Sequence, residues 1–167
     1  MTKFILHWGE MGSRWGVNRS VAQMHALLYL SPKPLTAEEI AGTLGLARSN
    51  VSNGLKELQT WELINVEHIL GDRRDHFQAE QDVWEMLKRV VEGRKRREID
   101  PTIELLRKCV DDMAKEKDTP KQVKERIAGT LEFMEETSRW YGQIGKLPRN
   151  VLLKLMKMGA KISSLVK

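Results

Sequence analysis

The chain has 167 residues, with 28 Lys and Arg against 23 Asp and Glu and a net charge of +5. That length is enough for one good core, or for a small domain with an appendage. The single cysteine, Cys109, excludes an intramolecular disulfide, and no apolar run approaches the roughly 20 residues that cross a bilayer. A cytoplasmic protein without membrane contact is therefore expected.

The positive charge is unevenly distributed. Residues 1–80 carry 8 basic and 9 acidic side chains, whereas residues 81–167 carry 20 and 14. A basic balance favours an anionic partner, but the whole excess lies in the second half of the chain. An argument for nucleic acid must therefore rest on particular positions.

Two helices are predicted before residue 46. Asn18 is the expected cap of the first, which the proline-containing segment 31–34 ends. Thr36 and Glu39 have the spacing of a capping box for the second, and Gly45 supplies its stop. The apolar positions of the first helix follow helical spacing at Val21, Met24 and Leu28.

The dipeptide Asn53-Gly54 is typical of a tight β-turn, but its surroundings indicate a helix. Val51, Leu55 and Leu58 recur at i, i+4 and i+7, and strand-forming residues are scarce nearby. Gly54 costs roughly 1 kcal/mol in a helix interior, and it falls beside the apolar stripe, where close helix contact justifies a missing side chain. The pattern predicts one helix from about 47 to 60.

A hairpin follows, and the rest of the chain is predicted to be helical. Ile64, Val66 and Leu70 alternate on one expected strand and Phe77 and Ala79 on the other, around residues 71–74. Further helices are expected over 81–99, 100–117 with Asp100 as cap and Pro101 in the first turn, about 119–144, and 148–166. On the third of these, a near-heptad seam for another helix comprises Val123, Ile127, Leu131, Met134, Ser138 and Tyr141.

A short helix, a glycine turn, a second helix and a charged hairpin make a helix-turn-helix with a wing. On a helical wheel the pole opposite Val51 carries small polar and basic side chains, and no carboxylate occurs from 47 to 56. Asn pairs well with adenine, and Lys with guanine or phosphate, whereas Arg48 at the helix start suits a backbone phosphate. An ordinary polar surface helix remains the alternative. The candidate DNA-binding residues of this helix are Arg48, Ser49, Asn50, Ser52, Asn53 and Lys56.

Arg73 and Arg74 are predicted at the hairpin tip, where a guanidinium can enter a minor groove. Asp72 and Asp75 flank them and offer two interpretations. Either the carboxylates neutralise both arginines locally, or Asp72 holds an arginine in the rotamer that inserts into the groove.

The stretches "LTAEEIAGTLGLARSNVSNGLKELQTWELI", "GDRRDHFQAE", "GEMGSRWGVNRSVAQMHALLYLS" and "RKRREIDPTIELLR" resemble MarR-type winged-helix transcription regulators. Within them the chain is most similar to the branch named for the glycine betaine synthesis repressor, over about residues 9–107. Two positions depart from the family pattern: Ala47 replaces the usual Ser or Thr cap, and Trp61 stands where a small residue is usual.

The resemblance implies a mainly α fold, a winged helix-turn-helix with N- and C-terminal dimerisation helices. It implies an N-terminal dimerisation helix at 1–17, a DNA-binding domain at 18–80 and a helical dimerisation and effector region at 81–167. It also implies a homodimer that binds double-stranded DNA at a pseudo-palindromic operator, often as a repressor. On this analogy Ser49, Asn50, Ser52, Asn53 and Lys56 belong to the major-groove helix, and Arg73 and Arg74 to the wing.

A small-molecule effector is also conceivable from the resembling branch. Tryptophans can cage a cation such as choline, although Trp8 and Trp15 lie one heptad apart, as in a dimer seam. The basic run 88–97 either lies near flanking phosphates or is a solvated connector. The weak effector candidates are Trp8, Trp15, Trp84 and Trp140.

Catalysis has no support in the sequence, and no cofactor or metal is expected. His7 and Glu10 share a helix face but have no third ligand, and no phosphate loop or nucleophile elbow is present. Cys109 is most simply a small core residue. The main alternative function is a winged-helix protein-interaction module that does not bind DNA, and a further alternative is a metabolite-binding protein.

Overall fold

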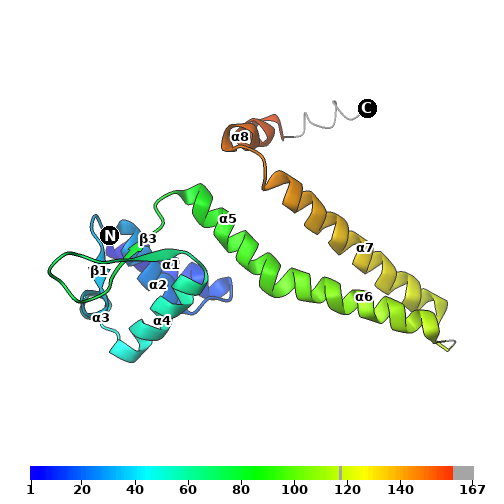
Figure 1. The fold of residues 1–167 in the computed structure, drawn as a ribbon, viewed down its shortest axis with the longest axis horizontal. Helices are drawn as coiled ribbons and strands as arrows, with labels where there is room; N and C mark the ends of the chain where they lie inside the picture. The colour runs from blue at the N-terminus through cyan, green and yellow to red at the C-terminus, as the bar shows by residue number, and fades with distance from the viewer. Residues whose placement is uncertain (117, 160–167) are drawn as a thin grey trace. The chain divides into compact units, whose positions relative to one another are not determined.

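The computed structural model describes residues 1–116 and 118–159, which divide into two compact units, Met1–Gly93 and the residues from Arg94 onward. The first unit holds α1 (Thr2–Arg14), α2 (Arg19–Leu30), β1 (Leu35–Thr36), α3 (Ala37–Leu44), α4 (Arg48–Thr60), β2 (Ile64–Glu67), β3 (His76–Ala79) and nearly all of α5 (Val83–Arg94) (Figure 1). The second holds the π-helical turn η1 (Lys95–Ile99), α6 (Asp100–Lys115), α7 (Lys121–Ile144) and α8 (Arg149–Met158).

The predicted helix ends of the first unit are confirmed. The Asn18 side chain accepts a hydrogen bond from the Ser20 amide at 2.9 Å and caps α2. Thr36 and Glu39 form both hydrogen bonds of the capping box, and Gly45 ends α3 with a left-handed φ of 64°. Because Gly45 needs no strain to adopt that angle, α3 stops cleanly and the chain turns into α4.

The predicted hairpin is present, but a third strand that the sequence did not predict joins it. The sheet has the order β1-β3-β2, with both pairs antiparallel. Leu35 pairs with Phe77 on one side of β3, and Val66 pairs with Phe77 on the other. Strand β1 has only two residues, too few to show an alternating pattern in the sequence. Leu70 is also misplaced in the prediction: β2 ends at Glu67 and Leu70 is fully exposed.

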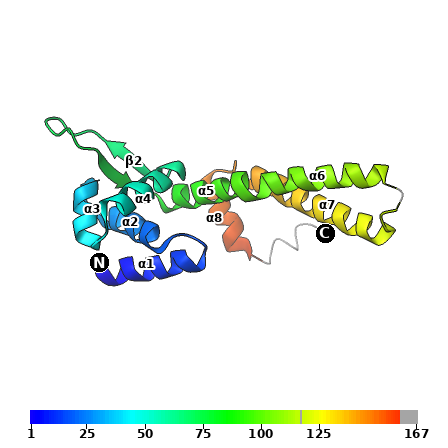
Figure 2. The same ribbon diagram turned by 90° about the horizontal axis from the view of Figure 1, so that it is seen from below.

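Helix α2 lies at the centre of the first unit, with α1 packed along it on one side and α4 on another (Figure 2). Its side chains are buried over most of its length. The surrounding helices and strands contribute Ile5, Ile40, Val51, Leu55, Leu58, Ile64, Phe77 and Ala79 to the same core. The helix-turn-helix therefore rests on a continuous apolar base.

The compact units do not follow the functional regions that the sequence suggested. Ile5 of α1 joins the core of the first unit, and that unit runs on to Gly93 rather than stopping at 80. The regions 1–17, 18–80 and 81–167 divide the chain by role, and that division stays a prediction.

Helix α6 begins at Asp100, but Asp100 is its first helical residue and not its cap, which corrects the sequence expectation. Ile99 and Asp100 are themselves helical, and no side chain caps α6. The wider π-helical turn at Lys95–Ile99 comes immediately before, and Pro101 lies in the first turn of α6. Such a turn accommodates the proline ring and its missing N–H without ending the helix.

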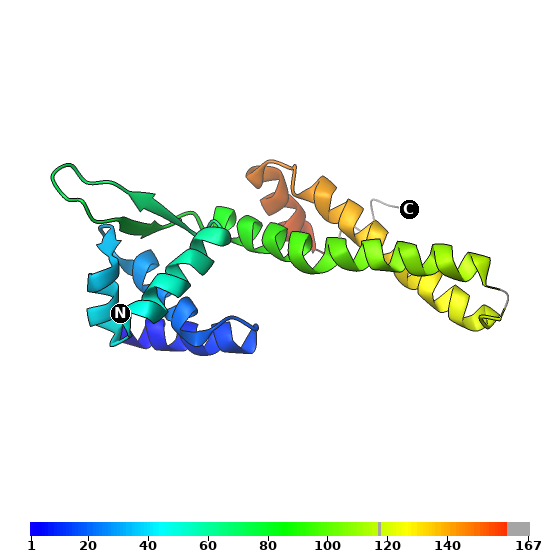
Figure 3. The same cartoon turned by 60° about the horizontal axis from the view of Figure 1, so that its bottom comes forward.

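The second unit is a helix pair with very little core. α6 and α7 contact each other next to the turn that joins them (Figure 3), and Ile103 is the one buried side chain in the described part of this unit. The predicted seam of α7 is half-buried apart from exposed Val123, and α6 is its neighbour. The last predicted helix is described only as far as Met158, so its expected end at 166 lies outside the described residues. No described helix is long and apolar enough to cross a membrane.

Candidate nucleic-acid interface

Helix α4 is held by the face that contains Gly54. A Cβ built on Gly54 would lie 2.0 Å from the Met24 Cε and 3.4 Å from the Val21 Cγ2 of α2. Val51, Leu55 and Leu58 are buried on the same side, so α4 approaches α2 as closely as the missing side chain allows. Asn53-Gly54 is thus not a turn, and the helix runs through both residues.

The opposite face of α4 is exposed and free of carboxylates over its first two turns. Its N-cap, Ala47, makes no side-chain hydrogen bond, and its first turn carries no acidic residue. Glu57 is the only carboxylate on the helix. An uncapped helix start with no acid beside it presents unsatisfied N–H groups and a positive dipole end. All six predicted residues of this helix are exposed: Arg48, Ser49, Asn50, Ser52, Asn53 and Lys56.

The wing is shaped by a turn just before its two arginines. Gly71 adopts a left-handed φ of 87°, and the Asp72 amide donates to the Ile69 carbonyl at 3.0 Å. Arg73 and Arg74 therefore follow the apex on the returning side of the hairpin. Arg73 is exposed and forms no ion pair among the residues described.

Asp72 grips Arg74. The Arg74 Nε donates to Asp72 Oδ1 at 2.9 Å and its Nη2 to Oδ2 at 2.5 Å, while the Arg74 amide also donates to Oδ1. These hydrogen bonds hold the pKa of the Asp72 carboxyl well below its usual range, and the pair raises the pKa of Arg74. Buried His76 also lies beside Asp72, with its Nε2 3.5 Å from Asp72 Oδ2. Asp72 is therefore paired with Arg74, a contact that both interpretations predict, and which of them applies stays a prediction.

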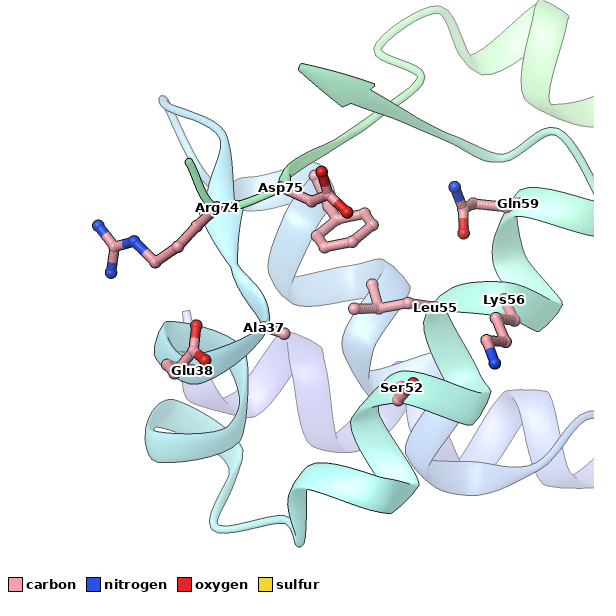
Figure 4. A pocket seen from close by; sticks show the side chains of 9 residues that line it. Ala37, Glu38, Ser52, Leu55, Lys56, Gln59, Arg74 and Asp75 are labelled. Carbon is pink, nitrogen blue, oxygen red and sulfur yellow. The ribbon is translucent and has the colours of Figure 1, made fainter. Parts of the chain in front are cut away.

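A hollow of about 370 Å³ separates α4 from the wing and the start of α3 (Figure 4). It brings three predicted residues together, Ser52 and Lys56 from α4 and Arg74 from the wing, although the Arg74 guanidinium extends away from α4. Its remaining lining is Ala37, Glu38, Leu55, Gln59, Asp75 and Phe77.

Two polar residues of this hollow, Gln59 and Glu38, were not singled out from the sequence. Gln59 lies seven residues after Ser52 and three after Lys56, so its helical spacing could have revealed it. Glu38 comes from α3, and Asp75, which the sequence showed only as a neighbour of the wing arginines, comes from the wing; the tertiary fold brings both to the hollow. Their carboxylates add negative charge beside the part of α4 that has none, residues 48–56.

The tryptophans suggested for an effector are spread over several elements. Trp8 stacks on Phe4 at 5.4 Å between ring centroids and also approaches His25. Trp15 follows the last residue of α1, Trp84 is the second residue of α5, and Trp140 lies on α7. A tryptophan cage stays a prediction. In the described part of the chain, no group of three or more metal-binding side chains converges.

Comparison with known proteins connects this geometry to a family. The sequence model of the MarR family matches residues 15–75, which contain α2, α3, α4 and the wing as far as Asp75. The HTH-type transcriptional repressor GbsR of Bacillus subtilis (strain 168) is 21% identical over 140 residues, covering 82% of this chain and 77% of the repressor.

A crystal structure of a transcriptional regulator shares the fold. It superimposes with a TM-score of 0.68 over 86% of this chain and 94% of the other, at 15% identity. The match extends well beyond residues 15–75 and so includes helices outside the helix-turn-helix. Residues 15–75 of this chain thus match the MarR family model, and the fold is that of a winged helix shared with a solved transcriptional regulator.

Proposed function

We propose that the protein regulates transcription by binding duplex DNA as a homodimer, with α4 in the major groove and the wing at the neighbouring minor groove. The observation that carries this proposal is the exposed face of α4, free of carboxylates from 47 to 56 in a chain that is 31% charged. A merely solvated helix would ordinarily mix both signs there. A helix face without carboxylates does not repel the phosphates of a DNA backbone.

The residue types divide naturally between positioning and reading. Asn50 and Asn53 offer the donor and acceptor pair that matches adenine, and Lys56 matches guanine or phosphate. Arg48 is the first residue of α4, whose N-terminus has no side-chain cap. A phosphate there is attracted both by the Arg48 guanidinium and by the positive end of the helix dipole. Asp72 holds the Arg74 guanidinium in place before DNA arrives, which lowers the entropy lost when it enters a groove.

The second unit supports a homodimer. Helix α7 is 24 residues long and has no buried residue, and Ile103 alone is buried in the described part of that unit. Phe133 and Trp140, one heptad apart on α7, are 69% and 59% exposed. A helix pair with so little core needs a further apolar surface, and a second copy supplies one of the same chemistry. The name of the GbsR relative, a transcriptional repressor, makes repression the expected outcome at the operator.

Selection from a random duplex library tests the proposal. The full chain should enrich an inverted repeat whose half-sites are about one helical turn, roughly 34 Å, apart, because a two-fold dimer presents two copies of α4. Enrichment of a single unrepeated site would contradict the dimer. Recovery of no sequence, together with no retardation of bulk genomic duplex at low salt, would contradict DNA binding altogether.

One observation favours the alternative of a protein-interaction module. Glu38 and Asp75 line the hollow between α4 and the wing, where they oppose a phosphate backbone and suit a basic protein partner. The double variant Glu38→Gln with Asp75→Asn distinguishes DNA binding from binding to a protein partner. Removing both charges should tighten binding to DNA but weaken binding to a basic partner.

A further inference from the structure

The turn that follows α4 contains the one non-glycine residue with positive φ in the described chain, Glu62 at 57°. The Glu62 amide donates to the Gln59 carbonyl at 2.8 Å, and the Leu63 amide to the Leu58 carbonyl at 3.0 Å. These two bonds make a Schellman motif, in which glycine usually takes the left-handed position. Because glutamate carries a Cβ, this conformation must be held by its surroundings.

Arg89 of α5 supplies part of that support. Its Nη1 donates to the Glu62 carbonyl, and its Nη2 lies 2.8 Å from Oε2 of Glu80, the residue after β3. The Glu80 amide in turn donates to the Leu63 carbonyl at 3.0 Å. Both charged side chains of this ion pair are largely covered, at 25% and 20% exposure. One guanidinium therefore ties α5 to the end of α4 and to the end of the wing.

Gly93 makes a second attachment one helical turn further on. A Cβ at Gly93 would lie 2.6 Å from both Cε3 and Cζ3 of Trp61, the residue that ends α4. Arg89 and Gly93 are four residues apart and so share a face of α5. The end of α4 lies against α5 accordingly (Figures 2 and 3). Trp61, which departs from the family pattern, is thus matched by a glycine on the helix it meets.

We propose that Arg89, Gly93 and Trp61 are positioning residues that set the direction in which α5 leaves the recognition helix and wing. In a dimer this direction determines the half-site spacing at which the two copies of α4 read DNA. The inference rests on the proposed function. Helix α5 carries the chain from the first unit, which ends at Gly93, into the second.

The test uses the full chain and duplexes built from its own selected site. Two half-sites are separated by spacers whose length increases by one base pair at a time. A duplex with a single half-site measures the affinity of one winged helix for its bases. Wild type should prefer one spacer. Gly93→Ala, which forces the Trp61 ring to move, should shift or flatten that preference. Its affinity for the single half-site should stay within about twofold, because α4's reading face is untouched.

Two further variants keep the test decisive. Trp61→Leu removes the ring without adding a clash and should also flatten the spacer preference. Trp61→Leu combined with Gly93→Ala should match Trp61→Leu alone, because the two residues act through one contact. Gly42→Ala is the matched control, since a Cβ there meets nothing within 4 Å, and it should retain the wild-type profile.

The outcomes separate this inference from the function beneath it. If the wild-type chain selects no duplex, the proposed function fails and the inference with it. If the chain selects DNA but Gly93→Ala and Trp61→Leu keep the wild-type spacer profile, the inference alone is overturned. An equal loss of affinity for the single half-site and for the paired site would also overturn it, because that pattern indicates damage to the winged helix itself.

Discussion

At the scale of single residues, Asn53 and Arg48 occupy one helix but should contribute differently to recognition. Asn53 lies in the middle of the exposed face, whereas Arg48 is the first residue of α4. Asn53→Ala should relax base preference at one position and cost about 1–3 kcal/mol on the preferred site. Arg48→Ala should weaken all sequences about equally. Binding of both variants to the selected duplex and to single-base variants of it checks this, and equal loss across sequences for Asn53→Ala would contradict it.

His25 makes the stability of the first unit depend on pH. Burial lowers the pKa of His25 from 6.5 to about 4, and its Nε2 is buried without a hydrogen-bond partner. Between these pH values His25 is therefore protonated in the unfolded chain and neutral in the folded chain. The stability associated with neutral His25 is complete above pH 6.5 and is lost as pH falls toward 4, by roughly 3 kcal/mol in total.

The His25→Leu variant tests this pH dependence. Denaturant unfolding followed from pH 7 to pH 4 should give a flatter profile for His25→Leu than for wild type. His7→Gln, at an exposed position, is the control and should retain the wild-type slope. Parallel profiles for wild type and His25→Leu would contradict a role for His25.

At the scale of elements, the close approach of α2 and α4 depends on Gly54. Gly54→Ala gains up to about 1 kcal/mol of helix propensity but overpacks buried Met24, at a cost of about 1–3 kcal/mol, so a net loss is expected. Gly42→Ala has the same propensity gain and open space around the new Cβ, so it should stabilise the protein. Thermal unfolding of both compares them. Equal stabilisation would show that the helices can move apart freely.

The elements also show which features a sequence can reveal. The α3 capping box, the Gly45 stop and the path of α4 through Gly54 follow from local spacing and were predicted correctly. Strand β1 was missed because two residues carry no periodicity, and their pairing with β3 is a tertiary event. The π-helical turn before Pro101 was missed for a related reason, since Asp-Pro is equally a start signal.

The candidate interface was predictable to a similar degree. The six polar residues of α4 share an exposed face because helical periodicity dictates it. Glu38, Asp75 and the attachment of Arg89 to Glu62 join residues that are far apart in sequence, and periodicity contains no information about them. The Asp72–Arg74 grip lies between these cases, because a short spacing suggested it and the structure supplied its geometry.

At the scale of the whole molecule, the exposed aromatic side chains of α7 should hold the dimer together. Phe133→Ala with Trp140→Ala should weaken self-association at least about tenfold, because buried aromatic side chains often contribute more than 2 kcal/mol each to an interface. Sedimentation equilibrium measures this. Leu70→Ala removes an even more exposed apolar side chain from the wing and should leave association unchanged. A wild-type chain that stays monomeric at high concentration would contradict the dimer.

The measurement that tests the central claim most directly is DNA affinity across a salt series, for wild type and for Arg73→Ala with Arg74→Ala. The account predicts that the logarithm of the wild-type binding constant falls steeply with the logarithm of salt concentration. The slope should be shallower for the double variant by about one for each phosphate contact removed, because fewer counterions are released. A wild-type affinity that does not change with salt, or identical slopes for the two proteins, would contradict it.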